Sequence, residues 1–248
     1  MMKQTTVNLT VYDRVIRVFH MLFGVLFIFS FTIGKLVDDD SLIYAYHMLS
    51  GILMLFIIVL RLIWGIIGTK YAKFNQFDLN LRHLTMYFKQ LLSGKTKQVA
   101  GHNPASSYAT VIMFTLTSGL IATGIFMTMD TNQKFVRFGE ISEDFHELLA
   151  TGFLLIVLFH IAGVMVHQLR HKDRLALSMV TGQKRLSVYQ FDVATQDLTQ
   201  RLKSTLGLLV FLSLTSMASY YLVSQFDNAT GRLTLFGHVL NLADHNHD

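Results

Sequence analysis

Five long apolar segments constrain the fold of this chain more than any other feature. They cover residues 18–34, 42–68, 108–129, 145–166 and 206–223. With its flanks, each can cross roughly 30 Å of hydrocarbon at about 1.5 Å per residue. Backbone groups in lipid must be paired within the chain, and the alternation of barrel strands is absent, so helices are the expected spanning structure. We therefore predict an all-α integral membrane protein.

Composition agrees with a membrane protein and narrows its chemistry. Hydrophobic residues are 52% and charged residues 15% of the chain, against about 25% charged in soluble proteins. There is no cysteine, which excludes disulfides, cysteine-ligated iron–sulfur clusters, thiolate zinc sites and covalent haem attachment. The net charge of +5 is typical of basic cytoplasmic loops, so no nucleic-acid partner is expected.

The distribution of basic residues predicts the orientation. One side of the membrane would carry most of them: Lys3, Arg14, Arg17, Lys70, Lys73, Arg82, Lys89, Lys95, Lys97, Arg170, Lys172, Arg174, Lys184, Arg185, Arg201 and Lys203. This asymmetry places the N-terminus in the cytoplasm and the C-terminus outside. The outer loops are acidic, with Asp38, Asp39, Asp40, Asp130, Glu140, Glu143 and Asp144. A partner on the outer side is therefore expected to be cationic or neutral.

Four histidines lie inside the apolar segments, at His20, His47, His146 and His160. His146 and His160 are 14 residues apart, which puts them on one face of a helix and about 21 Å apart along its axis. His20 begins the first helix on the cytoplasmic side, and His47 begins the second on the outer side. By depth, His20 therefore pairs with His160 and His47 with His146.

Two bis-imidazole sites at different depths are what a helical bundle needs to hold two non-covalent haems. Intramembrane ionisable residues are costly and usually functional. Four unrelated packing histidines are the alternative, but the match in depth weighs against it. A tetrahedral zinc site using all four is excluded, because about 21 Å separates the pairs while Zn–N bonds are near 2 Å.

Several other polar residues have open roles. Arg61 could bind a haem propionate or lie beside a quinone head group, or it could extend to the cytoplasmic surface; Arg17 has the same choice. His167 could replace His160 as the ligand. The remaining histidines are assigned to the surface or the propionate level (His83, His102, His171) or to a disordered polar tail (His238, His245, His247). Residues 76–92 are expected to form an amphipathic helix on the membrane surface.

Longer motifs resemble the bacterial cytochrome b561 and nickel-hydrogenase b-type cytochrome family. "YDRVIRVFHMLFG" is similar to its W-D-x-x-x-R-x-x-H-W start, with Tyr12 and Met21 in place of the tryptophans. "HMLSGILMLFIIVLRLIWGIIGTKYAKF", "GHNP" and "FHELLATGFLLIVLFHIAGVMVHQLRHKDRLALSMVTGQK" also fit the family, over residues 11–186. The resemblance implies a four-helix core with two b haems, ligated at positions that match His20, His47, His146 and His160. It also implies a bacterial inner membrane, with the C-terminus in the periplasm, and electron exchange with a quinone and a redox partner outside the membrane.

These features predict a three-part chain. Residues 1–186 would form the di-haem membrane domain, 187–203 a cytoplasmic connection that is helix or coil, and 204–248 a fifth transmembrane helix with a periplasmic tail. The expected function is electron transfer between quinone and a c-type cytochrome or a dehydrogenase or hydrogenase subunit. The alternatives are a superoxide:quinone oxidoreductase, which the acidic outer loops disfavour, and a structural subunit. A homo- or hetero-oligomer is compatible with each of these three functions.

Overall fold

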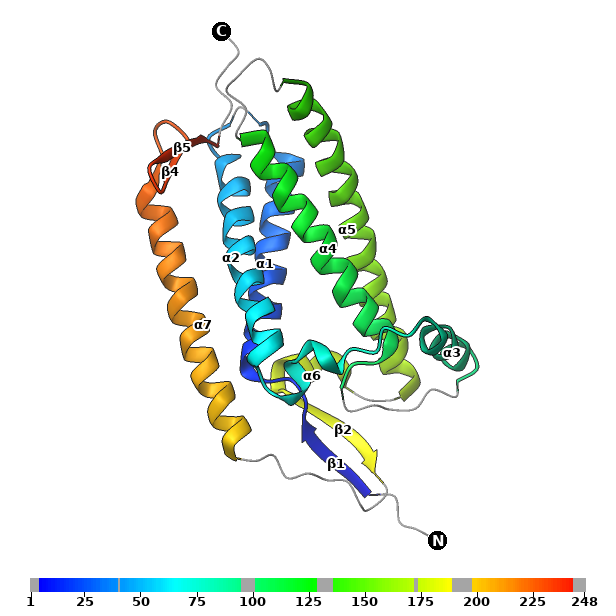
Figure 1. Ribbon diagram of the computed structural model, residues 1–248. Helices are drawn as coiled ribbons and strands as arrows, with labels where there is room; N and C mark the ends of the chain where they lie inside the picture. Colours follow the sequence, from blue (N-terminus) through cyan, green and yellow to red (C-terminus); the bar gives the residue numbers. More distant parts are fainter. Residues whose placement is uncertain are drawn as a thin grey trace. The chain divides into compact units, whose positions relative to one another are not determined.

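The computed structural model describes residues 5–39, 41–94, 101–128, 136–171, 174–188 and 198–242. Five of its helices are long and apolar enough to span a membrane: α1 (Arg14–Leu36), α2 (Ala45–Ile67), α4 (Pro104–Thr128), α5 (Val136–His171) and α7 (Leu198–Gln225) (Figure 1). Many leucine, isoleucine, valine and phenylalanine side chains on these helices are exposed in the isolated chain. Such a surface suits hydrocarbon and not water. The prediction of an all-helical membrane protein is confirmed.

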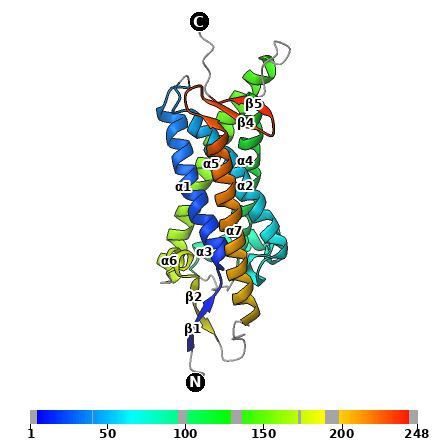
Figure 2. The same cartoon turned by 90° about the vertical axis from the view of Figure 1, so that its left-hand side faces the viewer.

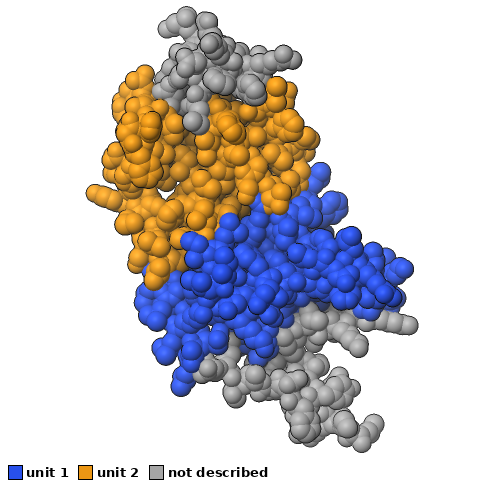
Figure 3. Space-filling view, viewed as in Figure 1, with its two compact units in different colours: residues 1–20, 61–114, 154–209 blue, residues 21–60, 115–153, 210–248 orange. Residues whose placement is uncertain are grey.

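The chain divides into two compact units (Figure 3). Unit 1 contains residues 1–20, 61–114 and 154–209, and unit 2 contains residues 21–60, 115–153 and 210–248. Each of the five long helices therefore contributes one segment to each unit.

Unit 1 contains a two-stranded antiparallel sheet that the sequence analysis did not predict. Strand β1 (Thr5–Thr10) pairs with β2 (Gln183–Val188), with Thr5 opposite Val188 and Thr10 opposite Gln183 (Figures 1 and 2). The two strands are about 180 residues apart in sequence, so no local sequence pattern predicts that they pair. Gly182 turns the chain from α6 (Leu175–Thr181) into β2 with a φ of +80°. A Cβ there would lie 2.8 Å from the Tyr12 carbonyl oxygen, so the turn requires glycine.

The amphipathic helix of unit 1 is shorter than predicted. It is α3 (Leu81–Leu92), preceded by the 3₁₀ turns η1 (Lys70–Ala72) and η2 (Phe74–Gln76). The Asn80 side chain accepts a hydrogen bond from the Arg82 amide (2.9 Å), which caps the helix and sets its first residue. The predicted start at residue 76 is therefore wrong.

Unit 2 contains a three-stranded antiparallel sheet after α7, in the order β3 (Phe226–Asp227), β4 (Arg232–Leu235) and β5 (His238–Asn241). Leu233 and Leu242 are buried together with Ala45 of α2 and Leu222 of α7. This apolar contact orders the segment, so the prediction that His238 belongs to a disordered tail is wrong. His245 and His247 lie outside the described residues.

Candidate haem-binding sites

The first histidine pair lies in unit 1. His20 on α1 and His160 on α5 have ring centres 6.4 Å apart, with the ring planes at 49°. The two segments that carry them are more than 130 residues apart in sequence. His167, the alternative partner, is 2% exposed and has its Nδ1 atom 3.4 Å from the Tyr87 hydroxyl. The geometry therefore favours His160 as the partner of His20.

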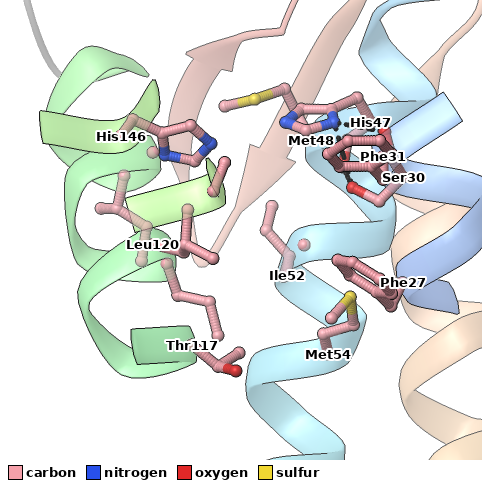
Figure 4. A pocket seen from close by; sticks show the side chains of 15 residues that line it. Phe27, Ser30, Phe31, His47, Met48, Ile52, Met54, Thr117, Leu120 and His146 are labelled. Atoms are coloured by element: carbon pink, nitrogen blue, oxygen red, sulfur yellow. Dashed lines mark hydrogen bonds between the residues drawn. The ribbon is translucent and has the colours of Figure 1, made fainter. Parts of the chain in front are cut away.

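The second pair lies in unit 2. His47 on α2 and His146 on α5 have ring centres 6.0 Å apart, with the ring planes at 72°. Figure 4 shows the two imidazoles on opposite sides of one cavity. Thus the structure brings together the same two pairs that the depth argument predicts.

Hydrogen bonds at Nδ1 determine which nitrogen of each imidazole in unit 2 is available. The Nδ1 atom of His47 lies 2.8 Å from the Ser30 carbonyl oxygen, and a carbonyl can only accept, so this nitrogen carries the proton. The Nδ1 atom of His146 lies 2.9 Å from the Thr123 hydroxyl, which itself donates to the Gly119 and Leu120 carbonyls (3.0 Å each). That hydroxyl must therefore accept from His146. Both rings are left with a lone pair on Nε2, the form that ligates a metal.

The cavity between the two rings is apolar. It has a volume of about 100 Å³, and Phe27, Phe31, Met48, Ile52, Met54 and Leu120 line it (Figure 4). Gly51, one turn after His47 on the same helix, also lines it, and a Cβ on this glycine would meet nothing within 4 Å. Most cofactor sites combine such apolar walls with a few polar groups that fix orientation.

The two pairs fit haem iron. With metal–imidazole bonds of about 2 Å and a ring centre about 1 Å behind its nitrogen, two imidazoles on one ion have ring centres about 6 Å apart. Both observed separations agree with this value. No group of three or more His, Cys, Asp or Glu side chains gathers in the described part of the chain. Each pair therefore offers two ligands, which matches the two axial positions of a haem iron.

Arg61 is buried in unit 1 with spare hydrogen-bonding capacity. It is 4% exposed, and its Nη2 atom donates to the Ala72 carbonyl (3.3 Å). Its guanidinium lies 5.0 Å from the ring centre of Phe74 and 6.0 Å from that of Phe114. Among the described residues, the buried Nη1 atom has no hydrogen-bond partner. A buried cation with an unused donor is costly unless an acceptor completes it.

Asp13, which the sequence analysis did not consider, organises the surroundings of Arg61. Its Oδ2 atom accepts hydrogen bonds from Trp64 Nε1 (2.8 Å) and from the Thr69 hydroxyl (2.6 Å). Its Oδ1 atom accepts from the Ile16 amide (2.8 Å) and caps α1. One buried carboxylate thus joins the start of α1 to the end of α2. Two signals in the sequence could have identified this network, namely the only tryptophan of the chain and the aspartate in the motif around Tyr12.

Arg17 and His102 complete the polar groups of this region. Arg17 donates through Nη2 to the Val180 carbonyl at the end of α6. His102 packs on Phe77, with ring centres 4.7 Å apart. Within the part of the chain that the structure describes, Nε of Arg17 and Nδ1 of His102 are buried without a hydrogen-bond partner. Burial, together with the positive charges of Arg61 and Lys184, lowers the pKa of His102 to about 4. His102 is therefore a neutral, half-buried group and not a surface residue.

Comparison with known proteins identifies the family. The sequence model of prokaryotic cytochrome b561 matches residues 11–182. No curated protein and no solved structure matches the chain. Members of this family typically bind two b haems, in agreement with two histidine pairs. The chain therefore belongs to the prokaryotic cytochrome b561 family, as a multi-pass membrane b-type cytochrome of electron transport with the family's four-helix core and one additional helix, α7.

Proposed function

We propose that this protein carries electrons between the membrane quinone pool and a periplasmic redox protein through two haem b groups. His20 and His160 would ligate one haem, and His47 and His146 the other. The observation that carries the proposal is the meeting of four intramembrane histidines in two pairs at the separation that a shared iron requires. Two axial imidazoles leave no vacant iron position, which suits electron transfer rather than oxygen binding.

The residues around His47 and His146 would orient these two imidazoles for haem binding. A bound haem supplies a one-electron carrier. The Ser30 carbonyl and the Thr123 hydroxyl hold His47 and His146 with Nε2 unprotonated and limit the rotation of each ring. The apolar side chains of the cavity would keep water from a bound haem. A site held in this way changes little in geometry when the charge on the iron changes.

Arg61 and Arg17 are the residues that we propose for the polar edge of the haem at His20 and His160. The unused Nη1 of Arg61 can donate to a propionate oxygen. Arg17 lies one helical turn before His20. We propose that a quinone head group binds in the same region, where His102 has a free buried ring nitrogen. A neutral imidazole can donate to or accept from a quinone oxygen without adding charge.

The loop charges support one orientation. The basic residues before α1 and in the connections after α2 and α5 would face the cytoplasm, and the acidic residues of the other connections would face the periplasm. A cationic or neutral partner, such as a small c-type cytochrome or a dehydrogenase or hydrogenase subunit, would then meet the acidic side. The lipid bilayer is the medium of the five spans, and an oligomer is compatible with this arrangement.

A haem count on purified variants tests the assignment. The chain should hold two non-covalent, low-spin haems b. His146→Ala should hold one and lose electron transfer from a quinol to a soluble c-type cytochrome. His83→Ala, which changes an exposed histidine paired with Asp78, is the control and should keep both haems. Two haems and undiminished electron transfer in His146→Ala would refute the pairing.

A further inference from the structure

Three lysines surround a polar cleft in unit 1 that the proposed electron pathway does not use. The cleft has a volume of about 350 Å³ and lies where the turns after α2 meet the start of α7. Lys70, Lys73 and Lys203 line it, together with the side-chain amides of Asn75, Gln76 and Gln200. The Lys70 amide donates to the Gln200 side chain (3.2 Å) and joins the two walls.

Among the described residues, those that line the cleft include three lysines and no carboxylate. Over the same part of the chain, the ion pairs are Lys35 with Glu147 and His83 with Asp78, so no carboxylate neutralises the three lysines. The Lys70 ammonium lies 5.6 Å from the ring centre of Tyr71, a contact that leaves its charge in place. Three cationic side chains around one cleft repel one another, and an anion with several oxygens would reduce this repulsion.

The wall that carries Lys70 and Lys73 is firmly held. Thr69, just before Lys70, donates its hydroxyl to Asp13 (2.6 Å), and Arg61 donates to the carbonyl of Ala72, just before Lys73 (3.3 Å). The ring of Phe74 packs so closely on Gly65 that a Cβ there would collide with it. The lysines therefore have a fixed backbone, which lowers the entropy lost on binding.

The opposite wall is held just as closely. Gly207 of α7 lies against the Trp64 ring, where a Cβ would again collide. This contact keeps the first turns of α7, and with them Lys203, beside the end of α2. The backbone on both sides of the cleft is therefore held by tertiary contacts.

The surroundings of the cleft are those of a membrane boundary. Lys70 follows the end of the apolar helix α2 by three residues. Exposed apolar side chains cover both helix ends, namely Ile63 (47% exposed), Ile66 (70%) and Ile67 (54%) on α2, and Leu202 (62%) and Leu206 (62%) on α7. A phosphate held by the lysines would thus have acyl-chain surface beside it. Basic pockets between membrane helices are suited to anionic headgroups.

We propose that this cleft binds the phosphate headgroup of an anionic membrane lipid and seats the start of α7 against α2. The lipid phosphate meets Lys70, Lys73 and Lys203, and its acyl chains lie along the exposed apolar ends of the two helices. The residues of this site are separate from the histidine pairs, and the proposal does not depend on the proposed electron pathway.

Native mass spectrometry of the haem-loaded protein, delipidated in detergent and titrated with dioleoylphosphatidylglycerol, tests the proposal. We expect one tightly held lipid, and about fivefold weaker binding for each of Lys70→Gln and Lys203→Gln. The matched controls are Arg201→Gln, two residues before Lys203 on the same helix, and Lys89→Gln on α3. Neither lines the cleft, and both should bind as the unchanged protein does.

Two further titrations distinguish a lipid phosphate from free inorganic phosphate. Dioleoylphosphatidylcholine should bind at least tenfold more weakly, and inorganic phosphate at millimolar concentration should not displace the anionic lipid. Displacement by inorganic phosphate would show a simple anion site and overturn the lipid assignment. Equal loss in the cleft variants and the controls would overturn it too. All variants should keep two haems, so a failure here is distinguishable from a failure of the proposed function.

Discussion

Replacement of Thr123 by valine isolates the hydrogen bond that orients His146. The two side chains have nearly the same shape, but Thr123→Val removes the hydroxyl that accepts from the His146 Nδ1 atom at 2.9 Å. Loss of such an outer partner typically costs 10–100-fold in metal affinity. The Leu120 carbonyl also interacts with this imidazole and can take over part of the bond. We therefore expect about a tenfold loss of haem affinity, or about 1.4 kcal/mol.

Ser30→Ala is the matched comparison, because the two histidines are held differently. His47 donates to the backbone carbonyl of residue 30 (2.8 Å), which alanine keeps. We expect less than a threefold effect, although the Ser30 hydroxyl also lies 3.0 Å from the same nitrogen. Thr110→Val, on the same helix as Thr123 and bonded only to the Ser106 carbonyl, serves as a control for the substitution itself.

The assay is transfer of haem to excess apomyoglobin, followed by absorbance. It is performed in a His20→Ala background, so that only the haem at His47 and His146 contributes. Equal haem affinity in Thr123→Val and Ser30→Ala would refute the argument that Nδ1 hydrogen bonds select the ligating form of these imidazoles.

Three further predictions concern other parts of the molecule. Gly51→Leu should place its side chain in the cavity and leave one haem per chain, with unchanged helix content by circular dichroism; two haems would contradict the proposed position of the porphyrin. Asp13→Ala should lower stability by about 3 kcal/mol, because two buried donors and a helix cap lose their acceptor; thermal unfolding against the exposed control Asp38→Ala measures this. The pKa of His102 is lowered to about 4, below its unfolded value of about 6.5, so protonation favours unfolding, and up to about 3 kcal/mol should be lost as the pH falls from about 6.5 to 4. His102→Gln should lose less stability over that range, and identical pH profiles would contradict the burial of His102.

The depths of the four candidate ligand histidines could be predicted from the sequence. Apolar length defines the helices, and a fixed rise per residue converts the spacing of His146 and His160 into depth. His20 and His47 begin helices of opposite direction, so their partners follow from depth alone. No such rule gives the first residue of α3 or the ordered segment around His238, which depend on the Asn80 cap and on the burial of Leu233.

Only the tertiary structure decides what surrounds these histidines. The partners of His47 and His146 are a carbonyl on α1 and a hydroxyl on α4, and the Asp13 network and the lysine cleft each join segments more than 50 residues apart. Hydropathy and helical periodicity predict which segments span the membrane, because the interaction of a helix with lipid depends on its local sequence. Directed hydrogen bonds between distant segments leave no period in the sequence, and they appear only when the helices pack together.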